Sequence, residues 1–252
     1  MTELELVVLG GVDKRGEREE VDRLVLRSGE VVGIVGPTGS GKTTLISDIE
    51  QMSVGDTPSR RRVLLNGSEA TSEVRDDPRN KPVAQLSQNM HFLADMSVEE
   101  FLRMHARSRG KDPALIPKVV EAANMLTGEG ISLGCHLTAL SGGQSRALMA
   151  ADIAIISDSP IVLIDEIENA GIRKREALAL LSGSGKIVVI VTHDPLLALL
   201  ASRRVVMAEG GMRTIVTRTA KEDEVCTRLA TIDDWLLSLR ETIRDGGMVT
   251  LA

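Results

Sequence analysis

The segment Gly36–Thr43, which reads GPTGSGKT, constrains the fold of this chain more than any other feature. Its spacing is that of a phosphate-binding P-loop, a glycine-rich turn that leads from a strand into a helix. The continuous apolar run Val31–Val35 comes directly before it. After it, Leu45, Ile49 and Met52 recur at helical spacing, which predicts a helix. The order strand, loop, helix indicates an α/β fold with a nucleotide phosphate as its ligand.

The residue types of this loop indicate how a nucleotide is held. Backbone N–H groups at a helix N-terminus point at phosphate oxygens, and the glycines let the backbone approach them closely. Lys42 is expected to reach the β- and γ-phosphates, and the Thr43 hydroxyl is expected to ligate Mg²⁺. ATP and Mg²⁺ are therefore the expected cofactors. The residues predicted to hold the nucleotide here are Gly36, Pro37, Thr38, Gly39, Ser40, Gly41, Lys42, Thr43 and Thr44.

Two further runs follow the P-loop in the chain. Leu140–Gln144 reads LSGGQ and precedes a helical pattern, so its serine and glycines form a second anion site at a helix N-terminus. Ile161–Ile164 is an apolar strand followed by Asp165 and Glu166. Ligands bind at the carboxyl ends of strands in open α/β sheets, so Asp165 is expected to hold Mg²⁺, through water.

Together, in this order, the three runs closely resemble the nucleotide-binding domain of the ABC (ATP-binding cassette) family. The resemblance extends from the first strand to about residue 216. It implies an α/β P-loop NTPase with a central, mostly parallel sheet, an antiparallel β edge subdomain and a small helical subdomain that carries the signature motif. The expected divisions are 1–87 and 157–218 for the two parts of the ATPase core, 88–156 for the helical subdomain and 219–252 for a C-terminal helical tail.

The resemblance also implies roles for individual residues. Glu166 resembles the catalytic carboxylate that orients the attacking water, and His193 resembles the switch histidine that contacts the γ-phosphate. Gln88 resembles the glutamine that senses Mg²⁺ and water, with Gln85 as the competing candidate. The signature residues face a γ-phosphate bound to the other subunit, which implies a head-to-tail dimer around two ATP. These signature residues are Ser141, Gly142, Gly143 and Gln144.

The resemblance favours the ATP-hydrolysing subunit of an ABC transporter, driving membrane permease subunits on separate chains. The alternative is a soluble ABC-type ATPase in metal-cofactor assembly or enzyme activation. A second copy of the chain is the expected ATPase partner. The net charge of −6 argues against a nucleic-acid partner, which favours a basic surface. No apolar stretch has membrane-spanning length, so the expected location is cytoplasmic, at the inner face of the membrane through a partner.

The pattern outside these motifs predicts further elements. Residues 3–9 and 21–27 indicate a β-hairpin edge, and the polar residues 68–82 indicate a loop. Ser97–Ala123 is helical with a break near Asp112-Pro113. The remaining expected elements are strands at Arg62–Leu65 and Ile187–Val191, a helix at Gly143–Ile156, and a late hairpin of Arg204–Met207 with Arg213–Val216. The basic clusters Arg60-Arg61-Arg62 and Arg173-Lys174-Arg175 are interpreted as solvated loop charge.

The chain departs from the usual cassette at two positions. No aromatic residue precedes the P-loop to stack on adenine, and Val12 or the Arg15 guanidinium is the expected substitute. After Glu166 the family has an acidic residue where this chain has Ile172. Both departures lie in segments that the family uses at its active sites.

Two surfaces are candidates for a partner. The resemblance implies a docking groove beside Gln88, lined by residues 88–110, which in the family receives a short helix from the partner; this region also holds both phenylalanines and several methionines, which suit an apolar contact. From Lys221 onward, apolar residues at alternating spacings of four and three form an amphipathic stripe. This stripe is expected to pack on the core of the chain itself, and the alternative is a docking face for a partner. Thr231 or Asp233 could split the stripe into two helices. The stripe is Val225, Leu229, Ile232, Leu236, Leu239 and Ile243.

Overall fold

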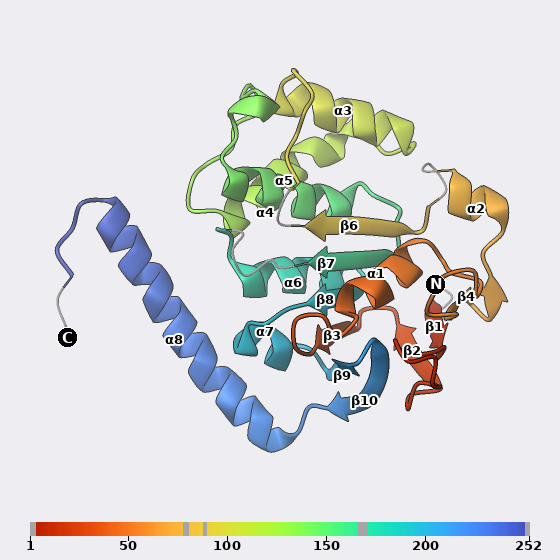
Figure 1. Ribbon diagram of the computed structural model, residues 1–252. Helices are drawn as coiled ribbons and strands as arrows, with labels where there is room; N and C mark the ends of the chain where they lie inside the picture. Colours follow the sequence, from red (N-terminus) through yellow and green to blue (C-terminus); the bar gives the residue numbers. More distant parts are fainter. Residues whose placement is uncertain (1–3, 78–80, 88–89, 166–170, 250–252) are drawn as a thin grey trace.

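A six-stranded sheet in the order β10-β9-β3-β8-β7-β6 forms the centre of the protein (Figure 1). The computed structural model describes residues 4–77, 81–87, 90–165 and 171–249. β10 runs antiparallel to β9, and the other neighbouring pairs run parallel, which confirms the mostly parallel sheet. The strands are β3 (Val31–Val35), β6 (Val83–Ser87), β7 (Ile161–Asp165), β8 (Ile187–Val191), β9 (Arg203–Ala208) and β10 (Gly211–Thr217).

A second, antiparallel sheet has the order β2-β1-β4-β5. β1 (Glu5–Leu9) pairs along its whole length with β2 (Arg23–Arg27), as the expected hairpin requires. β4 (Arg62–Leu65) pairs on the other side of β1, and β5 (Ser68–Glu69) closes the edge. Apolar side chains of this sheet, of the main sheet and of α1 (Lys42–Glu50) form one buried cluster, so the P-loop helix is packed between the two sheets.

Helices cover the other face of the main sheet and form a second buried cluster with it. The expected break in the helical region is confirmed: the first helix ends at Ser108 before Gly110, whose φ is 61°, and Asp112 caps a short turn that starts at Pro113 by accepting the N–H of Ala114. None of the helices in the described ranges has the length and apolar character needed to cross a membrane. The helices are α3 (Val98–Ser108), α4 (Ile116–Leu126), α5 (Gly142–Ile155), α6 (Lys174–Gly183) and α7 (Pro195–Leu200).

Two local expectations were wrong or incomplete. The segment 68–82 is not a plain loop, because it contains β5 and the short helix α2 (Ser72–Asp76). α2 buries none of its residues, so it left no apolar periodicity to detect. β6 also went unrecognised; Val83 and Leu86 are buried, but one edge strand with Gln85 between them has a weak pattern.

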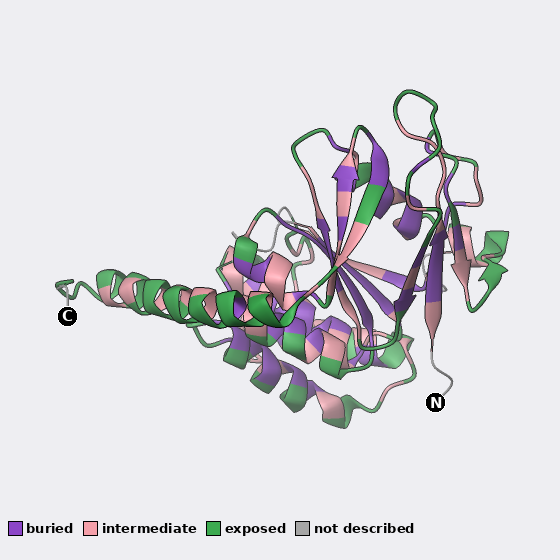
Figure 2. Ribbon diagram, turned by 90° about the horizontal axis from the view of Figure 1, so that it is seen from below, coloured by how far each residue is buried: buried purple, intermediate pink, exposed green. Residues whose placement is uncertain are grey.

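The C-terminal tail is one continuous helix, α8 (Ala220–Arg244), so neither Thr231 nor Asp233 splits it. The expectation that its stripe packs on the core was wrong. Cys226 is the buried residue of α8, whereas Ile232 is 50% exposed and Ile243 is 64% exposed. Figure 2 shows α8 extending past the body of the protein with mostly exposed and half-buried residues. Ion pairs, rather than apolar packing, hold much of the helix in place.

Candidate nucleotide-binding site

The carboxyl ends of four neighbouring strands bring the candidate residues to one edge of the main sheet. β3 ends at Val35, directly before the P-loop. Asp165, the last residue of β7, lies in register between Ser87 of β6 and Val191 of β8. His193 follows β8 by two residues. Parallel strands of one sheet end at the same edge, so motifs far apart in the sequence converge there.

A cavity of about 290 Å³ opens at this edge. It is lined by P-loop residues together with the ends of β7 and β8, so the P-loop, Asp165 and His193 share one site. The signature run does not line it. The lining residues are Lys14, Thr38, Gly39, Gly41, Lys42, Thr43, Thr44, Asp165, Val191 and His193.

The backbone of the P-loop requires glycine at its tightest contact. Gly41, the residue before α1, has a φ of 98°. A Cβ atom there would lie 2.7 Å from the Cα of Gly210, in the turn between β9 and β10. A larger residue would therefore be strained and would also push the loop away from this turn.

The hydrogen bonds of Lys42 and Ser40 indicate whether the loop fits a phosphate. The ammonium of Lys42 is buried and donates to the carbonyl oxygens of Gly36 at 2.8 Å and Pro37 at 3.1 Å. In the described part of the chain no carboxylate pairs with it, although a buried cation gains most from an anionic partner. The Ser40 hydroxyl is buried and makes no hydrogen bond within the described residues. A bound phosphate would satisfy both groups, so the loop fits this ligand.

The groups available for Mg²⁺ are few. Thr43 and Asp165 both line the cavity, and hydroxyl and carboxylate oxygens suit this ion when phosphate oxygens and water complete its coordination. Within the described ranges no cluster of three or more acidic, histidine or cysteine side chains forms a protein-only metal site. Gln88 and Glu166 follow Ser87 and Asp165 in the sequence but lie outside the described residues, so their roles stay predictions.

The loop that carries His193 is held by an ion pair. Asp194 accepts the N–H groups of Leu196 and Leu197 and so caps α7. Its carboxylate also lies 2.7 Å from the ammonium of Lys174, at the start of α6. Burial raises the pKa of Asp194, but the hydrogen bond from Lys174 and those from the helix outweigh it, so the pKa lies below its usual value. Lys174 is 10% exposed and also approaches Asp233 of α8, so it is not the solvated charge expected from its cluster.

The signature run forms the N-terminus of α5 as a capping box. The Ser141 hydroxyl accepts the N–H of Gln144, and the Gln144 side chain accepts the N–H of Ser141. Among the described residues, no hydrogen bond takes the N–H groups of Gly142 and Gly143. These two backbone donors lie at the start of a 14-residue helix and outside the cavity that Lys42 lines, so the anion site expected there stays a prediction.

Burial of the side chain accounts for the isoleucine at position 172, where the family has an acidic residue. Ile172 is buried in the core cluster beneath the helices, where an acidic side chain would lack a partner. Gly171, with a φ of 68°, lies close to Gly143, since a Cβ atom there would be 3.8 Å from the Cα of Gly143. Ile172 is therefore an apolar anchor, and Gly171 beside it lies near the first turn of α5.

The sequence interpretation missed a buried charged cluster beside the P-loop, which we call the Arg61 cluster: Arg61, Glu19 and Asp48. Arg61 is fully buried, so the interpretation of its basic run as solvated charge was wrong for this residue, whereas Arg60 and Arg62 are exposed as expected. Its guanidinium pairs with Glu19 and lies 2.9 Å from Asp48 on α1. Burial lowers the pKa of Arg61, but Glu19 and Asp48 raise it above its ordinary value. A lone arginine in a basic run has no sequence signal that separates it from its exposed neighbours.

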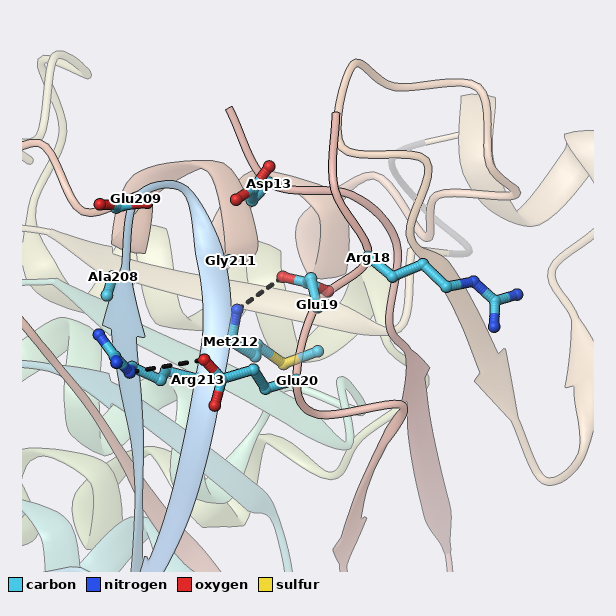
Figure 3. Close-up of a pocket in the computed structure, with 9 residues that line it drawn as sticks. All are labelled: Asp13, Arg18, Glu19, Glu20, Ala208, Glu209, Gly211, Met212 and Arg213. Atoms are coloured by element: carbon cyan, nitrogen blue, oxygen red, sulfur yellow. Dashed lines mark hydrogen bonds and ion pairs between the residues drawn. The ribbon is translucent and has the colours of Figure 1, made fainter. Parts of the chain in front are cut away.

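Glu19 also fixes the loop between β1 and β2. Its carboxylate accepts the N–H of Met212 at 2.7 Å and of Gly11 at 2.8 Å. Figure 3 shows this loop, with Asp13 and Glu19, lying against the β9–β10 hairpin around a small cavity. The buried carboxylate of Glu19 is thus occupied by structural bonds, and these bonds anchor the loop.

Comparison with known proteins agrees with this geometry. Residues 21–169 match the family model described as ABC transporter. The chain belongs to the ABC transporter family. It is 58% identical over 247 residues to the ABC transporter ATP-binding protein MJ0121 of Methanocaldococcus jannaschii, covering 98% of this chain and 95% of that protein. This ABC protein is an ATP-binding subunit by family, as the sequence resemblance predicted.

More distant ABC relatives are transport proteins. The chain is 33% identical over 208 residues to the lipoprotein-releasing system ATP-binding protein LolD of Shewanella sp., covering 78% of this chain and 87% of LolD. It is 29% identical to the macrolide export ATP-binding/permease protein MacB of Marinobacter nauticus, and it spans 38% of that protein's length. A solved ATP-binding subunit of an ABC transporter shares the fold, with a TM-score of 0.64 at 20% identity, covering 95% of this chain and all of that one.

Proposed function

We propose that this chain hydrolyses ATP with Mg²⁺ and drives conformational change in separate membrane permease subunits. The observation that carries the proposal is the single cavity shared by the P-loop, Asp165 and His193. The residue roles are those expected from the sequence: Lys42 neutralises phosphate charge, Thr43 and Asp165 hold Mg²⁺, and Glu166 orients water. Phosphoryl transfer depends mostly on positioning and electrostatics, so these few groups are sufficient.

The proposal includes a head-to-tail homodimer. The N–H groups of Gly142 and Gly143 stand at a helix N-terminus outside the cavity that Lys42 lines. One chain therefore holds two complementary half-sites. A second copy in the opposite orientation completes both, because an isologous pair repeats each contact twice.

A groove beside β6 is the proposed docking site for the permease. It has a volume of about 320 Å³ and lies between the β6 edge and α3. Phe92 and Phe101 pack edge to face in it, with ring centres 5.0 Å apart, and Met90 lines it at 36% exposure. Aromatic and methionine side chains suit an adaptable apolar contact. Attachment there places the chain at the inner face of the cell membrane.

Release of phosphate from ATP by the purified chain, with Lys42→Ala as the inactive control, tests hydrolysis. Met90→Asp tests docking, and Met104→Asp is the matched control, because Met104 is also exposed but does not line the groove. We expect Met90→Asp to hydrolyse ATP normally and to lose membrane permeases in a pull-down from native membranes. Capture of soluble enzymes in place of permeases supports the cofactor-assembly alternative. Retention of permeases by Met90→Asp moves the docking surface to the exposed stripe of α8.

A further inference from the structure

We propose that Lys14 is a second phosphate-binding cation of this site, and that the site therefore selects nucleotides by phosphate charge rather than by base. This inference rests on the proposed nucleotide-binding function. Lys14 belongs to the loop between β1 and β2 and lines the same cavity as Lys42. Its ammonium lies 2.6 Å from the carbonyl oxygen of Gly39, so the side chain reaches across to the P-loop itself.

The backbone of Lys14 is fixed, whereas its ammonium is free to exchange partners. The Lys14 N–H donates to the carbonyl of Glu209 at 2.9 Å, and the Asp13 carboxylate accepts the N–H groups of Arg15 and Glu17. With Glu19 buried in the Arg61 cluster, the loop is tied at both ends. The bond from Lys14 to Gly39 is exposed to solvent. A rigid base with an accessible terminal charge suits a ligand-binding side chain.

The stem of Lys14 lies against the turn between β9 and β10. Gly210 has a φ of 94°, and a Cβ atom there would lie 2.6 Å from the Cγ of Lys14. The opposite contact of Gly210 is with Gly41 of the P-loop. The backbone of Gly210 therefore lies between the stem of Lys14 and Gly41 of the P-loop, in close contact with both.

The present hydrogen-bond partner of Lys14 carries no charge. Among the described residues its ammonium bonds to a neutral carbonyl and to no carboxylate. An anionic oxygen adds the Coulomb attraction of opposite charges to such a hydrogen bond, which a neutral carbonyl oxygen does not supply. A phosphate placed on the P-loop beside Gly39 thus offers Lys14 a better acceptor within reach of its flexible stem.

The two substitutes expected for the missing aromatic residue do not occupy this place. Arg15 pairs with Glu209 at 2.9 Å in the open, and neither it nor Val12 lines the cavity. Among the described residues no phenylalanine or tryptophan lines the cavity either: Phe92 and Phe101 lie in the groove beside β6, and Trp235 is on α8. With no phenylalanine, tyrosine or tryptophan there to stack on the base, the phosphates are expected to carry most of the binding.

Calorimetric titration of the full chain with ATP and with GTP tests the inference. We expect wild-type affinities for the two nucleotides to agree within about tenfold, which is about 1.4 kcal/mol. Lys14→Ala should weaken both by the same factor, about tenfold or more, since a bond to a charged group is lost. Lys14→Arg should keep most of the affinity, and Arg15→Ala, the neighbouring control, should match wild type.

The outcomes separate the inference from the function on which it rests. Equal affinity of Lys14→Ala and wild type for both nucleotides overturns the inference, while the proposed function stands. A strong preference of the wild-type chain for ATP over GTP also overturns it, because a group that reads the base must then exist. If the wild-type chain binds neither nucleotide, as is expected of the control Lys42→Ala, the proposed function itself is overturned.

Discussion

The guanidinium of Arg61 donates a 2.8 Å hydrogen bond to the carbonyl oxygen of Gly210, the residue whose backbone lies against Gly41 of the P-loop. The same guanidinium pairs with Glu19 and with Asp48 on α1. A single buried side chain thus connects the β1–β2 loop, the P-loop helix and the β9–β10 turn. These are the segments that shape one side of the candidate nucleotide site.

Removal of Arg61 should destabilise the fold strongly. Arg61→Ala leaves two buried carboxylates without their cation, and we expect the free energy of unfolding in urea to fall by about 3–5 kcal/mol. Arg62→Ala is the matched control, because the Arg62 side chain is 55% exposed in its pair with Glu69. The control should lose at most about 1 kcal/mol. Equal, small losses in both variants would show that the cluster contributes no more than a surface ion pair.

Substitution of Gly41 should separate nucleotide binding from stability. In Gly41→Ala the new Cβ meets the backbone of Gly210, so the P-loop has to shift and ATP binding in a titration should be lost. Gly67→Ala is the control: its φ of 80° is also positive, but nothing lies within 4 Å of the new atom. The control should lose about 1–2 kcal/mol of stability from strain and bind ATP normally. Normal binding by Gly41→Ala would contradict the proposed role of this contact.

The lowered pKa of Lys186 predicts that the stability of the fold depends on pH. Burial lowers its pKa from 10.5 to about 8, while its ammonium donates to the carbonyls of Ser157 and Ser159. Between these two pH values the unfolded chain binds more protons than the folded one, so stability rises with pH. Below about pH 8 both states carry the proton and the effect is constant.

Comparison with Lys186→Met isolates this titration. The difference in the free energy of unfolding between wild type and the variant should move in favour of wild type as the pH rises from about 8 to 10.5. Urea unfolding across that range measures it. A difference that stays flat would mean that Lys186 titrates at its ordinary pKa in the folded protein.

The exposed stripe of α8 should contribute little to the stability of the isolated chain. Ile232→Gln replaces a half-exposed side chain, and we expect a change within about 0.5 kcal/mol. Leu197→Ala on α7 provides the comparison, because Leu197 is fully buried and its truncation should cost about 2–5 kcal/mol. A loss of stability in Ile232→Gln as large as that in Leu197→Ala would show instead that the stripe packs on the core.

The sequence predicted the elements whose pattern is continuous and buried. Ile161–Ile164 and Ile187–Val191 are strands because they are covered on both faces, and the P-loop spacing located the site at their ends. The pattern failed where burial is slight, as in α2, or where charge is buried, as in Arg61. An isolated arginine gives no sequence signal of its burial, since that depends on Glu19 and Asp48, which lie far away in the chain.

Lys14 was missed for a related reason. Sequence reasoning searched the loop before the P-loop for a group that resembles the usual ring, and so it selected Val12 and Arg15. Which of the consecutive residues Asp13, Lys14 and Arg15 faces the site depends on the turn that Asp13 closes and on the contact with Gly210. An irregular loop has no periodic pattern from which either the turn or this contact could be predicted.

The central claim, that each ATP site is completed by the signature of a second copy, is tested by complementation. Lys42→Ala removes the P-loop cation, and Gly143→Asp places a carboxylate at the signature; each variant alone should hydrolyse no ATP. In a mixture, the heterodimer holds one intact site, with the P-loop of the Gly143→Asp chain and the signature of the Lys42→Ala chain. Our account predicts that phosphate release returns on mixing. Two folded variants that stay inactive together, or a Gly143→Asp chain that is fully active alone, would contradict it.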